Sequence, residues 1–87
     1  MEELLKELEV SQKGVLIENT YTINLQTSNW YQYYFEKLEA NDEFEIDENS
    51  IHTDFDENSV VFYNDAYEIS LTANFSDNNY TMKIEEK

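Results

Sequence analysis

Two segments of the chain carry hydrophobic residues at i, i+3, i+4 and i+7, the spacing that gathers them on one side of an α-helix. The first segment is residues 1–10, with an apolar side formed by Met1, Leu4, Leu5 and Leu8. The second begins after Thr27 or Ser28, either of which can cap it, and should end near Asn41. Its apolar stripe consists of Tyr31, Tyr34, Phe35 and Leu38.

Elsewhere the hydrophobic residues alternate with polar ones, the period of a half-buried β-strand. Gly14 marks a break into a strand over residues 15–18, and a turn at Asn19 precedes a second strand over residues 20–25. The clearest alternation comes last, on a strand over 67–75 and a partner beginning at Tyr80. A turn at Ser76–Asn79 separates these two strands. On the strand over 67–75, one face carries the hydrophobic residues Tyr67, Ile69, Leu71, Ala73 and Phe75.

The middle of the chain contains a short internal repeat, since residues 46–51 and 55–60 share the pattern apolar-Asp-Glu-Asn-Ser-apolar. Asp, Asn and Ser bond locally to the backbone, so both copies are interpreted as reverse turns between short strands. Phe44 and Ile46 are expected to face the core, which points Glu43, Glu45 and Asp47 outward. Ile51 and Phe55 are expected to face the core in the same way.

The pattern as a whole predicts one α+β domain over residues 1–87. We expect an antiparallel sheet of about five to six strands, meander-like, with two helices packed on one face. Apolar residues make up 40% of the chain and aromatic residues 15%, which is enough to form a core and argues against disorder. The aromatic residues assigned to that core are Tyr21, Tyr31, Tyr34, Phe35, Phe44, Phe55, Phe62, Tyr67, Phe75 and Tyr80.

The net charge of the chain indicates which kinds of partner it can bind. The chain has 20 Asp and Glu residues against five Lys and no Arg, a formal net charge of -15. Phosphate contacts require Lys and Arg, so direct nucleic-acid binding is excluded, and an anionic membrane surface would repel the protein. The same field attracts a partner with a basic surface.

Half of the carboxylates lie between Glu36 and Glu57, a segment that we call the acidic tract. Its members are Glu36, Glu39, Asp42, Glu43, Glu45, Asp47, Glu48, Asp54, Asp56 and Glu57, and Lys37 is the only Lys among them. Their spacing along a strand and a helix is shorter than the Debye length of about 8 Å, so they act as one field. Such an array can stand in for the phosphates of a nucleic acid. The alternative is a solvated surface that only confers solubility.

Other chemistry has little support. Asp54, Asp56, Asn58 and Asp65 have the spacing of calcium-loop ligands, but Ser59 stands where that loop needs Gly, and strands flank it where helices belong. His52 is the only histidine, there is no Cys, and no Ser or Thr lies in a nucleophile motif. We therefore expect no enzyme activity, no cofactor and no metal.

Two aromatic residues lie off the helix stripe, Trp30 and Tyr33, close to Glu36 in the sequence. An exposed Trp or Tyr beside a charged patch is typical of an interface hot spot. These two residues join the acidic tract as candidate partner-binding residues. Packing against the core is the alternative for both.

In size, charge and lack of Cys and Arg the whole chain resembles the small acidic DNA-mimic proteins of phages and mobile elements, anti-CRISPR and anti-restriction proteins. The resemblance is one of composition, without a shared motif. It implies an inhibitor that occupies the basic groove where a defence nuclease holds DNA. The alternatives are an immunity protein or antitoxin that neutralises a basic toxin, and a non-catalytic interaction module. Since the first ten residues are amphipathic where a signal peptide would be continuously apolar, we expect a cytoplasmic location in a bacterial host cell.

Overall fold

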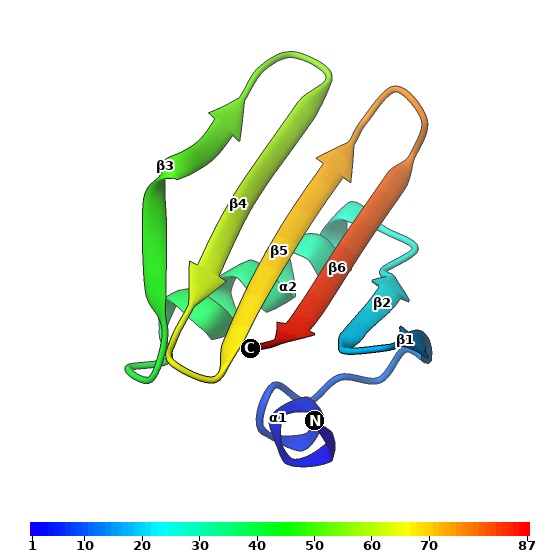
Figure 1. Cartoon of the computed structure of the whole chain (residues 1–87). Helices are drawn as coiled ribbons and strands as arrows, with labels where there is room; N and C mark the ends of the chain where they lie inside the picture. The colour runs from blue at the N-terminus through cyan, green and yellow to red at the C-terminus, as the bar shows by residue number, and fades with distance from the viewer.

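The computed structural model describes all 87 residues and has one antiparallel sheet of six strands in the order β1-β2-β6-β5-β4-β3 (Figure 1). The last four strands form a meander, and the β1–β2 hairpin joins it through pairing of β2 with β6. The strands are β1 (Gly14–Ile17), β2 (Thr20–Asn24), β3 (Glu45–Thr53), β4 (Glu57–Tyr63), β5 (Tyr67–Asn74) and β6 (Asn79–Glu86). The predicted α+β class is confirmed.

The chain has two helices, α1 (Glu2–Glu7) and α2 (Ser28–Glu39), and α2 covers the apolar face of this sheet. Thr27 caps α2 as predicted, because its side-chain oxygen accepts a hydrogen bond from the Trp30 N–H at 3.3 Å. In Figure 1, α2 crosses behind the strands and α1 lies beside one end of the sheet. Neither helix is long and apolar enough to cross a bilayer. Both helices and four of the strands, β2, β4, β5 and β6, contribute to a single core. It is formed by Leu4, Leu8, Ile23, Leu25, Tyr31, Tyr34, Leu38, Phe44, Val60, Phe62, Ile69, Leu71, Ala73, Tyr80, Met82 and Ile84.

Gly14 starts β1 because the chain approaches its neighbours closely there. A Cβ at this position would lie 2.6 Å from the backbone oxygen of Thr22 and 2.8 Å from the Tyr21 ring. The Tyr21 hydroxyl accepts a hydrogen bond from the Gly14 N–H at 2.8 Å. The tyrosine therefore packs over the glycine and fixes the outer strand to the sheet.

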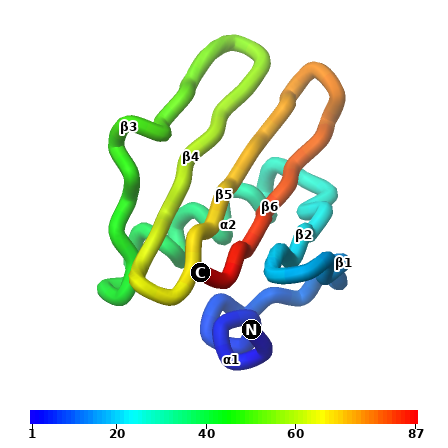
Figure 2. Tube along the Cα trace, in the orientation of Figure 1, coloured from blue at the N-terminus to red at the C-terminus, as the bar shows by residue number.

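The prediction of a reverse turn at residues 46–51 is wrong, because these residues form a bulge within β3. Asp47 pairs with Val61 and His52 with Ser59, so four residues of β3 lie opposite one residue of β4. The Ser50 hydroxyl stabilises the bulge: it donates to the Asp47 backbone oxygen at 2.6 Å and accepts from the Val61 N–H at 2.8 Å. The serine oxygen thus replaces a backbone acceptor in the ladder, and β3 bends sharply there (Figure 2).

Three hydrophobic residues expected to face the core are exposed. Phe55 is 95% exposed because β3 ends at Thr53 and the phenylalanine lies in the turn to β4, beyond the end of the sheet. Ile51 is 50% exposed at the bulged edge strand. Phe75 is 39% exposed because the β5–β6 turn starts at this residue, one position earlier than predicted, with Asn74 paired to Asn79.

Candidate functional site

The sheet has one face without helices, which we call the open face and which is turned to the viewer in Figure 1. Its central side chains are mostly short and hydroxylated, and strand pairing aligns them in rows such as Asn24, Thr81, Thr72, Ser59 and His52. Carboxylates lie around this polar centre. Ser70, Thr72, Thr81 and Lys83 line a depression at the centre of this face. A partner surface can approach the acids at its margin.

The acidic tract follows the β3 edge of the molecule. Glu36 and Glu39 lie on the half of α2 that leads into β3, and Glu45, Asp47 and Glu48 lie on β3 itself. Eight of the ten carboxylates are exposed, and Asp47 and Glu57 are half-buried. The expectation that Glu43 belongs to the strand is wrong, since Asp42 and Glu43 lie in the turn between α2 and β3. The tract is therefore a band around one edge and the adjoining turns.

Almost no positive charge neutralises this band. Lys37, the only Lys within the tract, points to the opposite side of α2 and bonds to Glu9, with Nζ 2.6 Å from the carboxylate oxygen. That bond lowers the pKa of Glu9 and raises the pKa of Lys37. Within the segment of the tract, His52 Nε2 forms a hydrogen bond with Asp54 Oδ2 at 2.8 Å, a contact that is an ion pair only when the imidazole is protonated. The remaining carboxylates of the tract have no cation within ion-pair distance.

Asp54 and Asp47 of the acidic tract also stabilise the local structure around them. Asp54 Oδ1 accepts hydrogen bonds from the backbone N–H groups of Asp56 and Glu57, both at 2.8 Å. The Glu57 bond first, and then those from His52 and Asp56, lower the pKa of Asp54. Asp47 Oδ1 accepts a hydrogen bond from the Asn49 N–H at 3.1 Å, inside the bulge. Substitution of either residue would disturb folding as well as charge.

The structure adds carboxylates that the sequence reasoning missed. Glu68 on β5 and Glu85 on β6 are directly opposite each other on the open face, and both are exposed. The same row continues through Tyr63 to Glu45 of the acidic tract. The charge of Glu45 and a hydrogen bond to it raise the pKa of Tyr63. Like charges directly opposite each other destabilise a sheet, so this row maintains negative charge at a cost in stability.

The β3–β4 turn presents Phe55 on a rigid support. Besides the bonds to Asp54, the Asp56 side chain accepts from Ser76 Oγ, and the Asp56 backbone oxygen accepts from the Phe75 N–H, each at 2.8 Å. The turn is thereby tied to the neighbouring β5–β6 turn. A large apolar side chain held in solvent by a fixed backbone, between two aspartates, has the character of an interface anchor.

Trp30 and Tyr33 are half-buried in an aromatic cluster with Tyr34, with ring centroids 5.2 to 5.7 Å apart. The Tyr33 hydroxyl donates to Glu9 at 2.8 Å. These contacts place Tyr33 on the side of α2 that faces the segment after α1, along with Lys37. A role of Trp30 and Tyr33 in partner binding remains a prediction, and packing accounts for much of their surface.

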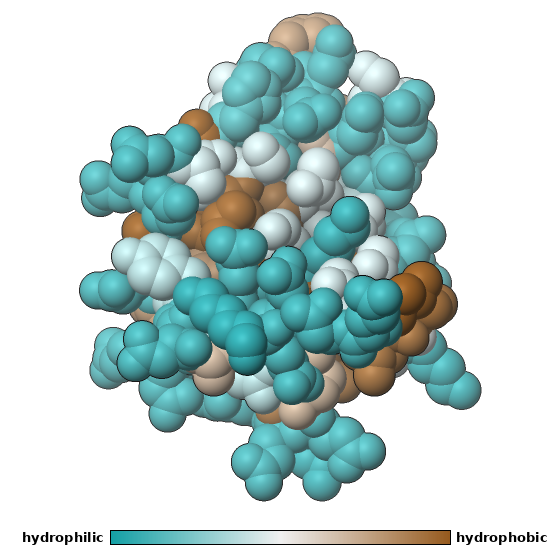
Figure 3. Space-filling model, viewed as in Figure 1, coloured by the Kyte–Doolittle hydropathy of each residue, from teal (hydrophilic) through white to brown (hydrophobic).

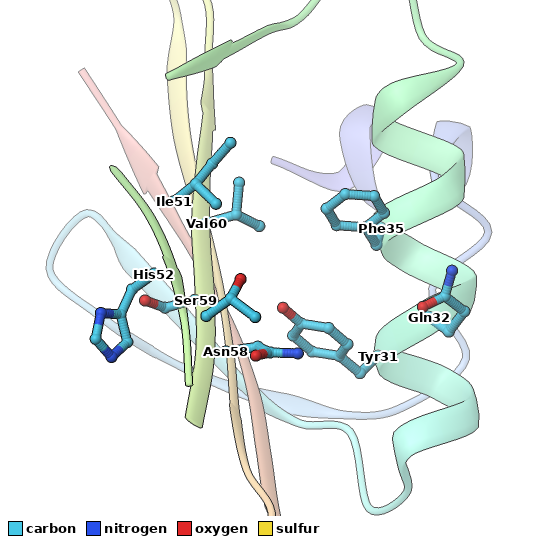
Figure 4. Close-up of a pocket in the computed structure, with 9 residues that line it drawn as sticks. Tyr31, Gln32, Phe35, Ile51, His52, Asn58, Ser59 and Val60 are labelled. Carbon is cyan, nitrogen blue, oxygen red and sulfur yellow. The ribbon is translucent and has the colours of Figure 1, made fainter. Parts of the chain in front are cut away.

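A cavity of about 200 Å³ opens between α2 and the β3–β4 hairpin. Figure 4 shows Tyr31 and Phe35 pointing from the helix toward the strands, while Ile51, Val60 and Asn58 point from the strands toward the helix. His52 points away from the cavity. Burial raises the pKa of Tyr31. Asn58 Oδ1 is buried and has no hydrogen-bond partner.

The opposite edge of the sheet is apolar. Val15, Leu16 and Ile17 form most of β1 and are 61%, 57% and 69% exposed. Figure 3 shows a hydrophobic patch at this side of the molecule, on a surface that is otherwise largely hydrophilic. An exposed edge strand with consecutive hydrophobic residues is a surface on which another strand can pair.

The titratable groups form no cluster of metal ligands, and the only histidine has a single side-chain partner. His52 bonds only to Asp54, and no hydroxyl lies within hydrogen-bond distance of its ring, as nucleophilic catalysis would require. No three or more Asp, Glu or His residues come together to hold a metal ion. The considered calcium loop is not formed, because Asp54 and Asp65 lie at opposite ends of β4.

No protein-family model, no functionally described protein and no solved structure matches the chain.

Proposed function

We propose that the protein is a non-enzymatic, acidic inhibitor that binds the basic, nucleic-acid-binding surface of another protein. It acts as a DNA mimic, and the target is a bacterial defence nuclease such as a CRISPR effector. The observation that carries the proposal is the acidic tract, in which eight of the ten carboxylates are exposed along one edge while the single lysine within the tract bonds to Glu9. A partner with a basic groove supplies the missing positive charge.

Charge density supports the comparison with DNA. The tract places ten carboxylates within a molecule whose longest extent is 33 Å; three of them, Glu45, Asp47 and Glu48, lie on β3, and the others lie on α2, in the adjoining turns and at the start of β4. Averaged over this extent, the band carries roughly one negative charge per 3 Å, comparable with the 3.4 Å per charge of one strand of duplex DNA. The acidic band therefore fits a groove that holds one nucleic-acid backbone, with the row of Glu45, Glu68 and Glu85 extending the negative field across the open face.

The β3–β4 turn gives this electrostatic surface an apolar contact. In a basic groove, Phe55 inserts into an apolar depression while the neighbouring carboxylates meet Lys and Arg. Charge steers the encounter and selects the partner, whereas burial of an aromatic side chain slows dissociation. The acidic tract thus sets the rate of association with the partner, and Phe55 in the turn sets the residence time of the complex.

The test is displacement of labelled DNA from a panel of purified defence nucleases, including an RNA-guided nuclease, followed by fluorescence anisotropy. Wild-type protein is compared with a triple charge reversal in the tract, Glu39, Glu43 and Glu48 to Lys. These side chains make no hydrogen bond or ion pair within the protein. The matched control reverses three carboxylates outside the tract: Glu2, Glu18 and Asp65.

We expect the tract variant to displace DNA at least about 100-fold less well and the control less than about threefold less well, because a carboxylate facing a basic groove becomes a like-charge contact. Displacement by the wild-type protein should weaken steeply as salt rises. Equal losses in both variants would mean that total charge alone matters. Absence of displacement from every nuclease would reject the DNA-mimic function.

A second candidate, a protein-interaction module, is favoured by the exposed β1 edge. In that case a partner strand pairs with β1 and covers Val15, Leu16 and Ile17. Binding would then be insensitive to salt and would be lost on Leu16→Lys. The triple reversal in the acidic tract would leave it intact.

A further inference from the structure

The two edges of the sheet are protected to different degrees. The β3 edge has a bulge between Asp47 and His52 and carries carboxylates, and both features discourage another strand from pairing. The β1 edge has neither a bulge nor a charge at its centre, where Val15, Leu16 and Ile17 are consecutive and exposed. An unprotected hydrophobic edge is prone to aggregation unless a defined strand covers it.

Backbone hydrogen bonds show which residues of β1 can bond to such a strand. Leu25, which directly follows β2, donates to the Tyr80 oxygen of β6 at 2.7 Å. Because bonding directions alternate along a strand, the even-numbered residues of β2 bond the other way, toward β1. Val15 and Ile17 are paired with even-numbered residues of β2, so their N–H and C=O groups point inward. Those of Leu16 therefore point to solvent.

Leu16 is the residue at which a second strand can dock. The N–H of Gly14 also points outward, but it already donates to the Tyr21 hydroxyl at 2.8 Å. Within β1, both a free N–H and a free C=O are thus offered by Leu16 alone. Two residues directly opposite each other in an antiparallel pair exchange two hydrogen bonds, so Leu16 of a second copy supplies the matching donor and acceptor.

Pairing centred on Leu16 also matches the side chains. Leu16 lies on the helix side of the sheet with Tyr21, while Val15 and Ile17 lie on the open face. In a symmetric antiparallel pair the two Leu16 side chains meet, and each Val15 lies opposite Ile17 of the other copy. Hydrophobic residues are then covered on both faces of the sheet.

Charge favours a second copy of this chain as the partner. A basic partner is attracted to the acidic tract, whereas residues 10–35 contain one acid, Glu18, and one base, Lys13. This neutral segment includes β1, so two molecules of net charge -15 repel each other least when they approach there. Neither Lys13 nor Glu18 forms an ion pair within the molecule. Pairing centred on Leu16 places Lys13 opposite Asn19 of the second copy, next to its Glu18.

We propose that two copies of the protein pair antiparallel through β1, with Leu16 at the twofold axis, and form one continuous sheet. The two β3 edges then lie at opposite ends of this sheet, eleven strand spacings or roughly 50 Å apart. Both acidic tracts stay accessible, and assembly stops at the dimer because each end is a protected β3 edge. The dimer does not depend on the DNA-mimic function, to which it would give two acidic tracts in one particle.

The test is sedimentation equilibrium of the purified protein. Since β1 has four residues, the interface is smaller than the standard size and the dimer is weak. Between about 10 µM and about 1 mM protein, the mass should rise from 10.4 kDa toward twice that value. Raising salt from about 0.05 M to about 0.5 M should strengthen the dimer at least about threefold, because screening reduces repulsion between the copies. Displacement of DNA is expected to respond to salt in the opposite direction.

A pair of lysine variants locates the contact. Leu16→Lys puts two like charges at the twofold axis and removes apolar burial, so it should weaken the dimer at least about tenfold. Phe55→Lys makes the same change of charge at a residue that is 95% exposed, and it should leave the dimer unchanged. Loss of the dimer in both variants would show that the contact is not β1.

Two measurements keep the test decisive if Leu16→Lys fails to fold. Hydrogen exchange of the wild-type Leu16 amide should slow at least about threefold over the same concentration range, because dimerisation gives this N–H an acceptor. Lys13→Glu should weaken the dimer about threefold, and adding Glu18→Lys should restore it at unchanged net charge. Lys83→Glu, which makes the same charge change two strands away from β1, should have little effect.

Three results would overturn the pairing: a monomer at about 1 mM protein in high salt, a dimer that persists in Leu16→Lys, or assembly beyond two copies. A strand of another protein on β1 of a molecule that stays monomeric would likewise reject it, in favour of the interaction module. These variants leave the acidic tract intact, so their failure does not affect the DNA-mimic function. A confirmed dimer that displaces no DNA would retain the pairing and reject that function.

Discussion

The position of Glu68 directly opposite Glu85 allows the effect of their repulsion on the free energy of unfolding to be predicted. Directly opposite side chains of an antiparallel pair have Cβ atoms about 5 Å apart, and at that distance two unit charges in water repel by roughly 0.8 kcal/mol. Screening reduces this to roughly 0.7 kcal/mol at 0.01 M salt, 0.4 at 0.15 M and 0.2 at 1 M. No lysine lies within ion-pair distance of either carboxylate.

A double-mutant cycle isolates this repulsion. Glu68→Gln, Glu85→Gln and the double variant are compared with wild type by urea denaturation at the three salt concentrations. Each single substitution removes the repulsion, and the double substitution removes it only once. The stability gains of the two single variants should therefore add up to more than the gain of the double variant, and the difference should equal the repulsion energy given above for each salt concentration. Effects of net charge and of Lys83, which lies on the same face, cancel in the cycle. Unchanged urea dependence of the unfolding free energy would show that the denatured state is unaffected.

A cycle pairing Glu68 with Glu2, which lies on α1, serves as the control and should give no coupling beyond error. A coupling near zero at low salt, or one that does not decline with salt, would refute the reasoning, because the two carboxylates would then be turned away from each other. If the open face contributes to binding, the same variants that gain stability should displace DNA less well. Gain of stability without loss of binding would show that this row is not part of the interface.

Three further predictions follow from the acidic edge and its turn. Phe55→Ala should leave the free energy of unfolding within about 0.5 kcal/mol, since the side chain is 95% exposed, yet weaken partner binding more than about tenfold; urea denaturation and competition binding measure the two. Ser50→Ala should cost about 1–3 kcal/mol because it leaves the Val61 N–H without an acceptor, whereas Ser59→Ala, which removes no such bond, should cost little. Because folding lowers the pKa of Asp54, its contribution to the turn is present above the ordinary Asp pKa of about 3.9 and is lost as pH falls through the lower folded value; NMR shifts of the Asp56 and Glu57 amides should report this change, and Asp54→Asn should abolish it.

Local sequence signals are sufficient to predict several elements of this fold. The helix stripe, the Thr27 cap and the alternation along β5 and β6 depend on residues within a few positions of one another, and all three are confirmed. Net charge is also a property of composition alone. The ion pair between Lys37 and Glu9 does not follow from composition, because Glu9 lies 28 positions away in the sequence and is brought to α2 only by packing.

Tertiary structure decided the features on which the proposed site depends. Residues 46–51 have the composition of a turn, but the Ser50 hydroxyl finds the Val61 N–H of the next strand and the segment becomes a bulge. A β5–β6 turn one residue later would have placed Glu68 opposite Lys87 instead of Glu85, which shows how strand register sets the charge of the open face. Phe55 has the hydrophobicity of a core residue, yet it lies beyond the last paired residues of the sheet. Burial, register and cavities arise from contacts between distant segments, and periodicity within one segment does not encode them.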